Sequence, residues 1–200
     1  MIGKTSSAHL DLGCGMYPRN PYGRDDLSGI DLHAGLPGAS SFRYVRANIT
    51  LEPIPFEDNT FDSLSAFDFI EHVPRQLAVD GELILPFVRL MNEIWRVLRP
   101  GGLFYAVTPA YPSAAAFQDP THVNIITVKT HEYFCGEKAY GRNYGFHGDF
   151  EALRVKWVIE KNAYTAEESL RKTLRAWHRR VSSGRPTHLL WELRAIKKDK

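Results

Sequence analysis

The sequence predicts an α/β protein built on a doubly wound, mostly parallel sheet of seven strands. Short apolar runs that end at a glycine or an acid, such as residues 9–13, recur along the first half of the chain. A helical pattern separates two of the later runs, and strands that alternate with helices indicate parallel pairing through crossovers. The carboxyl ends of such strands share one edge of the sheet, where the chemistry is expected.

Five of the seven strands are expected within the first 109 residues. They combine apolar and β-branched residues, and turn residues separate them. The two final strands lie near the C-terminus and would finish the sheet as an antiparallel edge. The expected strands span residues 9–13, 27–32, 42–49, 61–67, 103–109, 150–161 and 188–198.

Residues 82–98 predict an amphipathic helix before the fifth strand. Apolar residues recur there at helical spacing, and the Arg-Pro-Gly-Gly sequence at 99–102 ends the pattern. The crossovers between the earlier strands carry no comparable pattern and are expected to be irregular. A short helix is expected near residues 128–134, and a basic helix at about 166–181 would cover the sheet edge with its apolar face.

Length and composition indicate one soluble domain. A chain of 200 residues with 44% hydrophobic content can bury a single sizeable core. The first residues lack the apolar core of a signal peptide, and no run approaches membrane-spanning length, so a cytoplasmic location is expected. Cys14 and Cys135 provide neither a disulfide framework nor a metal knuckle, and both are interpreted as reduced thiols.

The charge is uneven although its net value is only +2. Residues 151–200 hold thirteen Lys and Arg against six Asp and Glu, whereas the preceding residues are acidic overall. Such asymmetry can mark a surface for nucleic acid or another polyanion. The favoured interpretation is a solvated helix face followed by a Lys-rich end.

The first strand runs into a glycine turn, "LDLGCGMYPRNP", that lets a ligand approach the backbone closely. The dinucleotide fingerprint needs a third glycine where Pro18 stands, and no Gly-Lys-Ser/Thr loop is present. Pro18 and Pro21 also prevent a regular helix after the turn. These features disfavour a pyrophosphate and favour a nucleoside-like ligand without phosphates.

Two acids complete this pattern. Asp31 ends the second strand, about sixteen residues beyond Gly15, and a carboxylate there can accept both ribose hydroxyls. Asp11 precedes the glycines, where it would either accept backbone N–H bonds that hold the turn or meet a cationic group of the ligand. The pattern therefore predicts a ribose-binding site.

Four motifs in series resemble class I S-adenosylmethionine-dependent methyltransferases of the small-molecule type. They are "HLDLGCG", the acid of "GIDLH", "IPFEDNTFDSLSAFDFIEHV" and "NEIWRVLRPGGLFYAVTP", and they cover about residues 8–110. The resemblance implies a Rossmann-like methyltransferase fold that binds S-adenosyl-L-methionine and releases S-adenosyl-L-homocysteine. Residues 8–109 would then form the cofactor-binding half, 110–148 a substrate or lid insertion, and 149–200 the C-terminal edge strands and basic helix.

The resemblance also implies which residues contact the cofactor. The glycine turn would line the methionine part of the cofactor, and the acid after the second strand would bind its ribose. The residues after the third strand would contact the adenine, and the end of the fourth strand would face the methyl-bearing side. Asn48 departs from the Asp common in the family, but its carbonyl can still accept a bond from the adenine amine. The implied residues are Asp11, Gly13, Cys14, Gly15, Asp31, Leu32, Asn48, Ile49, Phe67 and Asp68.

The chain departs from the family at its start, where helices that roof the cofactor would usually precede the first strand. The loop at residues 16–26, the insertion at 110–148, or a second subunit in a homodimer would have to supply that roof. The sulfonium of the cofactor is positive and would gain nothing from a helix N-terminus, so the prolines after the glycine turn are compatible with this ligand.

The insertion carries the candidate catalytic residues. In "DPTH", Asp119 would orient His122, which would act as the general base that removes a proton from an acceptor hydroxyl. His122 could instead close the loop by hydrogen bonds, or the pair could hold a divalent cation that binds a sugar diol. Two ligands are too few for a site, so no metal is predicted. His72 is expected to pack and to cap the turn after the fourth strand.

The insertion is loosely similar to that of bacterial methyltransferases associated with glycan and O-antigen synthesis. A small-molecule or glycan hydroxyl is therefore the expected acceptor. One alternative is a nucleic-acid acceptor, tRNA or DNA, suggested by the basic C-terminal residues Arg171, Lys172, Arg175, Arg179, Arg180 and Arg185. The other is a non-catalytic cofactor-binding subunit that stabilises a partner.

Overall fold

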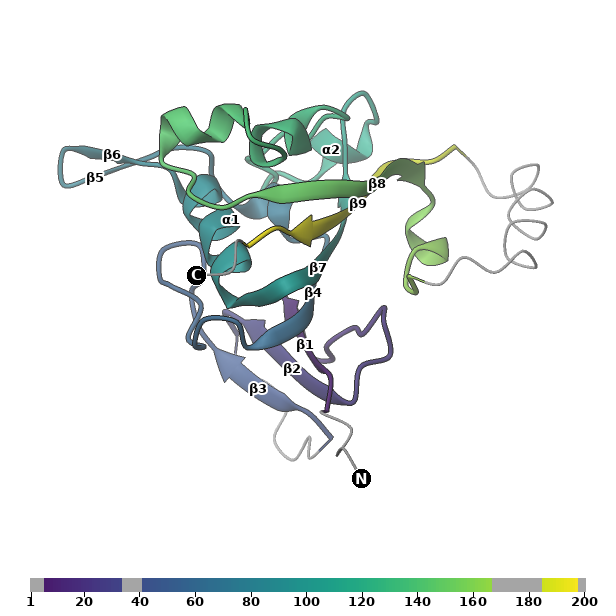
Figure 1. Cartoon of the computed structure of the whole chain (residues 1–200). Helices are drawn as coiled ribbons and strands as arrows, with labels where there is room; N and C mark the ends of the chain where they lie inside the picture. Colours follow the sequence, from purple (N-terminus) through teal and green to yellow (C-terminus); the bar gives the residue numbers. More distant parts are fainter. Residues whose placement is uncertain (1–5, 34–40, 167–184, 198–200) are drawn as a thin grey trace.

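A mixed seven-stranded sheet forms the centre of the computed structural model, which describes residues 6–33, 41–166 and 185–197 (Figure 1). The strand order is β3, β2, β1, β4, β7, β9, β8. The first five strands of this order pair in parallel, and β9 pairs antiparallel with both β7 and β8. The predicted mostly parallel sheet is thereby confirmed. The strands span Ala8–Leu12 (β1), Asp26–Asp31 (β2), Arg43–Arg46 (β3), Phe61–Phe67 (β4), Leu98–Pro109 (β7), Phe150–Val158 (β8) and His188–Ala195 (β9).

The third strand is shorter than its sequence predicts, ending at Arg46 rather than at residue 49. The chain turns just beyond it, because the backbone carbonyl of Asn48 accepts hydrogen bonds from the amides of Leu51 and Glu52. The side chain of Ile49 packs into the main hydrophobic core at this turn. Its apolar character therefore reflects burial rather than strand pairing.

The predicted helix at 82–98 begins later than expected, because its first residues belong to a hairpin. Strands β5 (Leu77–Val79) and β6 (Glu82–Ile84) pair antiparallel across Asp80 and Gly81, which both have positive φ. An Asp-Gly pair favours this two-residue hairpin turn. Helix α1 (Pro86–Val97) then starts with a proline in its first turn, where a missing N–H costs nothing.

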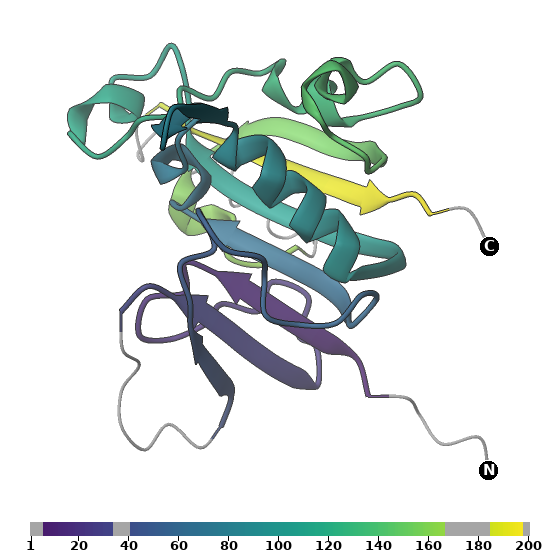
Figure 2. The ribbon, with the colours of Figure 1, turned by 90° about the vertical axis from the view of Figure 1, so that its left-hand side faces the viewer.

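Helix α1 covers one face of the sheet (Figure 2). Its buried residues join one core with the side chains that alternate strand residues direct to the same side. Leu10 and Leu12 of β1 belong to this core. His9 and Asp11, which alternate with them, point to the other face and are buried but polar. The two faces of β1 therefore differ in chemistry.

On the opposite face of the sheet, the segment after the glycine turn, which contains no helix, packs together with residues in the segment that follows β8. The ring of Tyr22 packs edge-on against Tyr105 at 5.9 Å, and its hydroxyl donates to Glu192 Oε1 at 2.8 Å. The Arg19 guanidinium lies 4.8 Å from the ring centre of Phe67. Side chains of an irregular loop thus stand where a crossover helix would otherwise pack.

The other helices of the described residues are short. The expected helix near 128–134 is the 3₁₀ helix η2, and most of the expected basic helix, residues 167–181, lies outside the described residues. No helix in the described part of the chain is long and apolar enough to cross a membrane. The short helices are α2 (Ala115–Gln118), η1 (Ile70–His72), η2 (Thr130–Phe134), η3 (Tyr140–Tyr144) and η4 (Glu160–Asn162).

The insertion at residues 110–148 docks on the turn that follows β4. The amides of Val123 and Asn124 both donate to the carbonyl of Glu71, at 3.0 and 2.9 Å. The Asn124 side chain donates to the Ile70 carbonyl at 3.1 Å. These bonds fix the insertion over the carboxyl ends of β4 and β7, where the chemistry was expected.

Candidate active site

The glycine turn depends on both of its glycines, for different reasons. Gly13 and Gly15 have φ values of +65° and +58°, a region that side chains disfavour. A Cβ at Gly13 would also lie 2.4 Å from the ring of Phe69, whereas a Cβ at Gly15 would meet open space. Phe69 was not anticipated from the sequence, because nothing in its spacing indicates that its ring touches the turn.

Asp31 is brought to this turn as predicted. Its carboxylate accepts the amide of Gly15 at 2.9 Å and that of His33 at 3.0 Å, so it ties the turn to the end of β2. Each carboxylate oxygen has a second acceptor position, which leaves capacity for ribose hydroxyls. The neighbouring Leu32 is 54% exposed and free to contact a flat ring.

The residues after β3 are placed differently. Asn48 opens the turn that ends the strand, and its side chain is partly exposed. Ile49 is 6% exposed and packs in the core, so its backbone rather than its side chain is available to a ligand. Of this pair, only Asn48 has a side chain that a ligand could reach.

Asp11 is buried behind the glycine turn. Its carboxylate accepts the Arg19 amide at 2.8 Å and the Ser65 hydroxyl at 2.5 Å. It therefore holds the loop backbone, which was the first of its two expected roles. Burial raises the pKa of Asp11 to about 7, although both hydrogen bonds oppose that change.

A buried series of hydrogen bonds leads to Asp11, and it was not predicted from the sequence. The Ser65 hydroxyl donates to Asp11, so its oxygen accepts the N–H of His9 Nε2 at 2.8 Å. His9 Nδ1 then accepts from the Ser63 hydroxyl at 2.8 Å. Burial lowers the pKa of His9 to about 3, which keeps the ring neutral. This series forms because β1 and β4 pair in the register that sets His9 beside Ser63.

Cys14, in the middle of the glycine turn, is inert by position. Its amide donates to the Ile30 carbonyl at 3.0 Å, and a Cβ at Gly29 would lie 2.6 Å from its sulfur. Gly29 thus leaves room for this thiol inside β2. Burial, helped by the nearby carboxylates of Asp11 and Asp31, raises the pKa of Cys14 to about 12.

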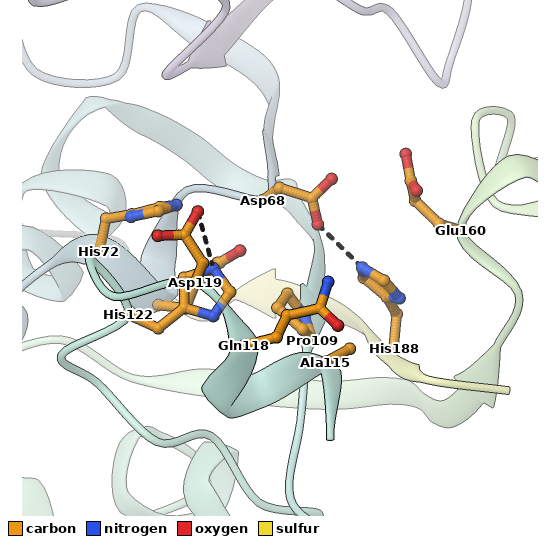
Figure 3. A pocket seen from close by; sticks show the side chains of 10 residues that line it. Asp68, His72, Pro109, Ala115, Gln118, Asp119, His122, Glu160 and His188 are labelled. Carbon is orange, nitrogen blue, oxygen red and sulfur yellow. Dashed lines mark ion pairs between the residues drawn. The ribbon is translucent and has the colours of Figure 1, made fainter. Parts of the chain in front are cut away.

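A cavity of about 280 Å³ opens beyond the carboxyl ends of β4 and β7 (Figure 3). Its lining comes from η1, from the insertion around α2, from η4 and from the start of β9, and it is rich in carboxylates and imidazoles. The titratable residues that line it are Asp68, Glu71, His72, Asp119, His122, Glu160 and His188.

Asp68 stands between the glycine turn and this cavity. It has a φ of +49°, which is uncommon outside glycine and is typical of functional sites. Its Oδ1 lies 3.0 Å from Nε2 of His188 (Figure 3). The pKa of His188 is raised: burial alone would lower it, but the attraction of the Asp68 carboxylate is stronger. Phe67, just before it, turns to the opposite side and packs under Arg19.

Asp119 and His122 meet in the cavity, and His72 joins them. Asp119 Oδ2 lies 4.0 Å from His122 Nε2, which is too long for a hydrogen bond. Asp119 Oδ1 instead accepts the Thr121 hydroxyl at 2.6 Å, and the Thr121 oxygen lies 3.0 Å from His72 Nδ1. The Asp119 carboxylate thus orients His72, through Thr121, more directly than it orients His122.

Glu71 reaches the same cavity from η1 although it is only 1% exposed. Its Oε2 accepts the Thr108 hydroxyl at 2.8 Å, while Oε1 is buried without a hydrogen-bond partner among the described residues. Burial raises the pKa of Glu71 to about 7. Glu71 was not predicted from the sequence, because a Glu between Ile70 and His72 gives no sign of its depth.

The strand order, with one reversed strand inside the sheet, and the glycine turn after β1 define a Rossmann-like methyltransferase fold. Residues 10–106 match a family described as a methyltransferase domain. No curated protein sequence matches the chain.

Solved structures share this fold at low sequence identity. One is an S-adenosylmethionine-dependent methyltransferase from Mesorhizobium loti, with 18% identity, a TM-score of 0.54, and 94% of this chain and 91% of that chain covered. Another is geranyl diphosphate methyltransferase in complex with S-adenosylmethionine, with 17% identity, a TM-score of 0.53, and 96% and 79% covered. A third is a complex of the Haloferax volcanii Trm112 methyltransferase activator with a putative methyltransferase, with 15% identity, a TM-score of 0.59, and 98% and 86% covered.

The match over residues 10–106, just under half of the chain, makes it a methyltransferase, and S-adenosylmethionine is the cofactor that this domain and fold imply. The residues present fit an adenosyl group. The turn at Gly13 and Gly15 exposes backbone, Asp31 keeps acceptor positions, and Leu32 offers an exposed apolar surface.

Proposed function

We propose that the enzyme transfers the methyl group to a hydroxyl oxygen of a small-molecule or glycan acceptor that binds in the cavity beyond β4 and β7. The observation that carries this proposal is the lining of the cavity, in which carboxylates and imidazoles surround about 280 Å³. Such groups can accept and donate hydrogen bonds to a hydroxyl-rich molecule. Asp68 links this cavity to the end of β4, the side on which the methyl group would be presented.

In this proposal the cofactor lies across the glycine turn. Gly13, Cys14 and Gly15 contact its methionine part, while Asp31 accepts the ribose hydroxyls. Asp11 contributes by fixing the Arg19 amide, and so the loop over the turn. The methyl-bearing side faces Asp68 and the backbone of Phe67, whose buried ring packs away from the cavity. The adenine lies between Leu32 and the turn at Asn48 and Ile49. Residues 16–26 and the insertion, or a second subunit, complete the enclosure.

Methyl transfer from a sulfonium needs alignment, exclusion of water and, for a hydroxyl acceptor, removal of a proton. His122 is the proposed base. The geometry supports Nε2 as its proton-accepting atom, because the Ala116 carbonyl, 3.3 Å away, engages Nδ1. Asp119, 4.0 Å from Nε2, would stabilise the imidazolium that forms.

The ribose assignment is tested by binding. We expect S-adenosylhomocysteine to bind at about micromolar affinity and Asp31→Ala to weaken it at least about tenfold, or roughly 1.4 kcal/mol, by calorimetry. Asp26→Ala, an exposed acid at the opposite end of β2, is the matched control and should bind as the wild type does. Equal affinity in Asp31→Ala and the wild type would remove the assignment.

The alternative acceptor is a nucleic acid. Its support is the basic C-terminal segment together with the fold shared with the methyltransferase bound to the Trm112 activator. Binding of tRNA that weakens steeply with salt, or turnover that appears only after a partner protein is added, would favour this alternative or the non-catalytic subunit. We expect neither for the isolated chain.

A further inference from the structure

We propose that Glu71, His72 and His122 form a binding site for a divalent transition-metal ion, best suited to zinc, at the inner wall of the cavity. One ligand atom of each residue lies within 4.8 Å of the corresponding atoms of the other two. Two imidazoles and one carboxylate are a ligand set that holds catalytic zinc and leaves a coordination position open.

The fold brings the three residues together from two distant segments. Glu71 and His72 follow β4 in η1, and His122 belongs to the insertion. The bonds from the amides of Val123 and Asn124 to the Glu71 carbonyl hold the segments in contact. The rings of His72 and His122 consequently lie 4.8 Å apart, at an interplanar angle of 76°.

Hydrogen bonds orient both imidazoles for metal binding. The Thr121 hydroxyl donates its only proton to Asp119, so its oxygen must accept the N–H of His72 Nδ1. His122 Nδ1 donates in the same way to the Ala116 carbonyl. Both rings therefore keep the lone pair on Nε2. Metal-ligating histidines are held by this kind of outer hydrogen bond.

The Glu71 carboxylate has an unmet requirement that a cation would fill. Its Oε2 accepts the Thr108 hydroxyl, but its buried Oε1 has no hydrogen-bond partner in the described part of the chain. A buried polar atom without a partner is costly and rare in native proteins. A metal ion coordinated by Oε1 would remove that cost.

The three side chains need to move only slightly to bind an ion. Bonds of about 2.0–2.2 Å place the ligand atoms of a tetrahedral zinc site roughly 3.5 Å apart, so side-chain rotations that move these atoms by about 1 Å would suffice. Asp119 Oδ2, 4.0 Å from His122 Nε2, lies near enough to add a fourth contact or to bond a coordinated water. The remaining position would face the cavity.

A second cluster in the cavity is less suited to a metal. Asp68, Glu160 and His188 also present ligand atoms within 4.8 Å of one another. However, Nε2 of His188 already lies 3.0 Å from Asp68 Oδ1, and Thr187 Oγ1 lies 2.8 Å from Nδ1, so both ring nitrogens have a close neighbour. Asp68 Oδ1, like Glu71 Oε1, has no hydrogen-bond partner among the described residues, so this cluster serves as the comparison.

The ion would also refine the chemistry, and this step rests on the proposed function. A hydroxyl of the acceptor at the open position would lose its proton more readily beside a divalent cation. His122 Nε2 would then coordinate the ion instead of taking the proton, so the proton released by the hydroxyl would pass to the neighbouring Asp119 carboxylate. Turnover on an acceptor would be lost on chelation and restored by zinc.

Metal binding is tested on the tag-free full chain after chelator treatment, by titration with Zn²⁺ and with Co²⁺ as a spectroscopic probe. We expect one ion per chain and affinity at least about tenfold weaker in His72→Ala and in His122→Ala. His147→Ala, an exposed histidine, controls for nonspecific binding, and His188→Ala reports on the second cluster. Both should bind as the wild type does.

The proposal is overturned if the wild type binds no ion, if the two ligand variants bind as tightly as the wild type, or if His188→Ala alone abolishes binding. Circular dichroism confirms that each variant is folded. Binding of S-adenosylhomocysteine is measured in parallel. If the wild type does not bind S-adenosylhomocysteine, the proposed function is contradicted. If it binds S-adenosylhomocysteine but no metal ion, only the metal site is contradicted.

Discussion

Gly13 and Gly15 look equivalent in the sequence, yet the structure gives them different tolerances. Both have positive φ, so alanine at either position should cost about 1–2 kcal/mol of backbone strain. Gly13→Ala should cost more, because its Cβ would meet the Phe69 ring at 2.4 Å. Urea denaturation of both variants measures the free energy of unfolding, and we expect Gly13→Ala to be the less stable of the two.

A double-mutant cycle isolates the steric part of this effect. Phe69→Ala removes the ring, so Gly13→Ala should be less damaging in that background than in the wild type. Gly15→Ala has no neighbour within 4 Å at its added Cβ and should cost the same in both backgrounds. Additive effects of Gly13→Ala and Phe69→Ala would contradict the contact.

At this scale the sequence predicts local pairings better than distant ones. The link between Asp31 and the glycine turn follows from motif order, because both flank the ends of adjacent strands. The contacts of His9 with Ser63, and of His72 with Thr121, depend on strand register and on how the insertion docks. No spacing rule reaches across fifty residues, so these contacts required the structure.

Among the elements, α1 is joined to the loop before β4 by one side chain. The Arg96 guanidinium donates to both carboxylate oxygens of Glu93, to the carbonyls of Ile54 and Phe56, and to Asp58. These five bonds use its planar fork, which a lysine cannot reproduce. Arg96 therefore ties the loop before β4 to α1, together with the bond from the Ile54 amide to Glu93.

We expect Arg96→Lys to destabilise the protein by about 1–3 kcal/mol and to speed amide exchange at Ile54, whose N–H bonds Glu93. Arg89→Lys, at an exposed position of the same helix, should change stability by less than about 0.5 kcal/mol. Hydrogen exchange and urea denaturation provide both readouts. Equal effects of the two substitutions would show that the bonds of Arg96 contribute little.

The elements also show where pattern reading stops. The strands and α1 are predictable from periodicity, and the missing crossover helix from Pro18 and Pro21. The predicted helix wrongly includes residues of the β5–β6 hairpin, because Leu83 fits the apolar spacing of α1 when that spacing is extended toward the N-terminus. The Asp80–Gly81 pair was the signal that could have separated them.

Across the whole molecule, the two buried titratable residues of β1 act on stability in opposite senses. Burial lowers the pKa of His9 to about 3, so its contribution to stability is lost as the pH falls from 6.5. Burial raises the pKa of Asp11 to about 7, so its contribution is present at low pH and lost as the pH rises from about 4 to 7. Between pH 4 and 6.5 the two slopes oppose each other.

Asp11→Asn removes one side of this balance. We expect the free energy of unfolding of the wild type, minus that of the variant, to increase as the pH falls from 7 to 4, by up to about 1.4 kcal/mol per pH unit. Urea denaturation at several pH values measures this difference, in which the other titrating groups cancel. A constant difference across the range would mean that the pKa of Asp11 is not raised.

The sheet, its order of elements and the region of the site were all predictable from the sequence, because they depend on periodicity and on motifs at strand ends. The way the back of the sheet is covered was not, since it depends on how Arg19 and Tyr22 reach across to Phe67, Tyr105 and Glu192. Neither side chain stands in an amphipathic pattern. Irregular loops leave no periodic signal from which such packing could be read.

The burial of Cys14 affects whether its thiol could react with the methyl donor. A thiolate is a strong nucleophile, and in the proposed arrangement this sulfur lies beside an activated methyl donor. With a pKa of about 12, only about one thiol in 10⁵ is ionised at pH 7. In the proposed arrangement, the protonated thiol of Cys14 would therefore not compete with the acceptor for the methyl group.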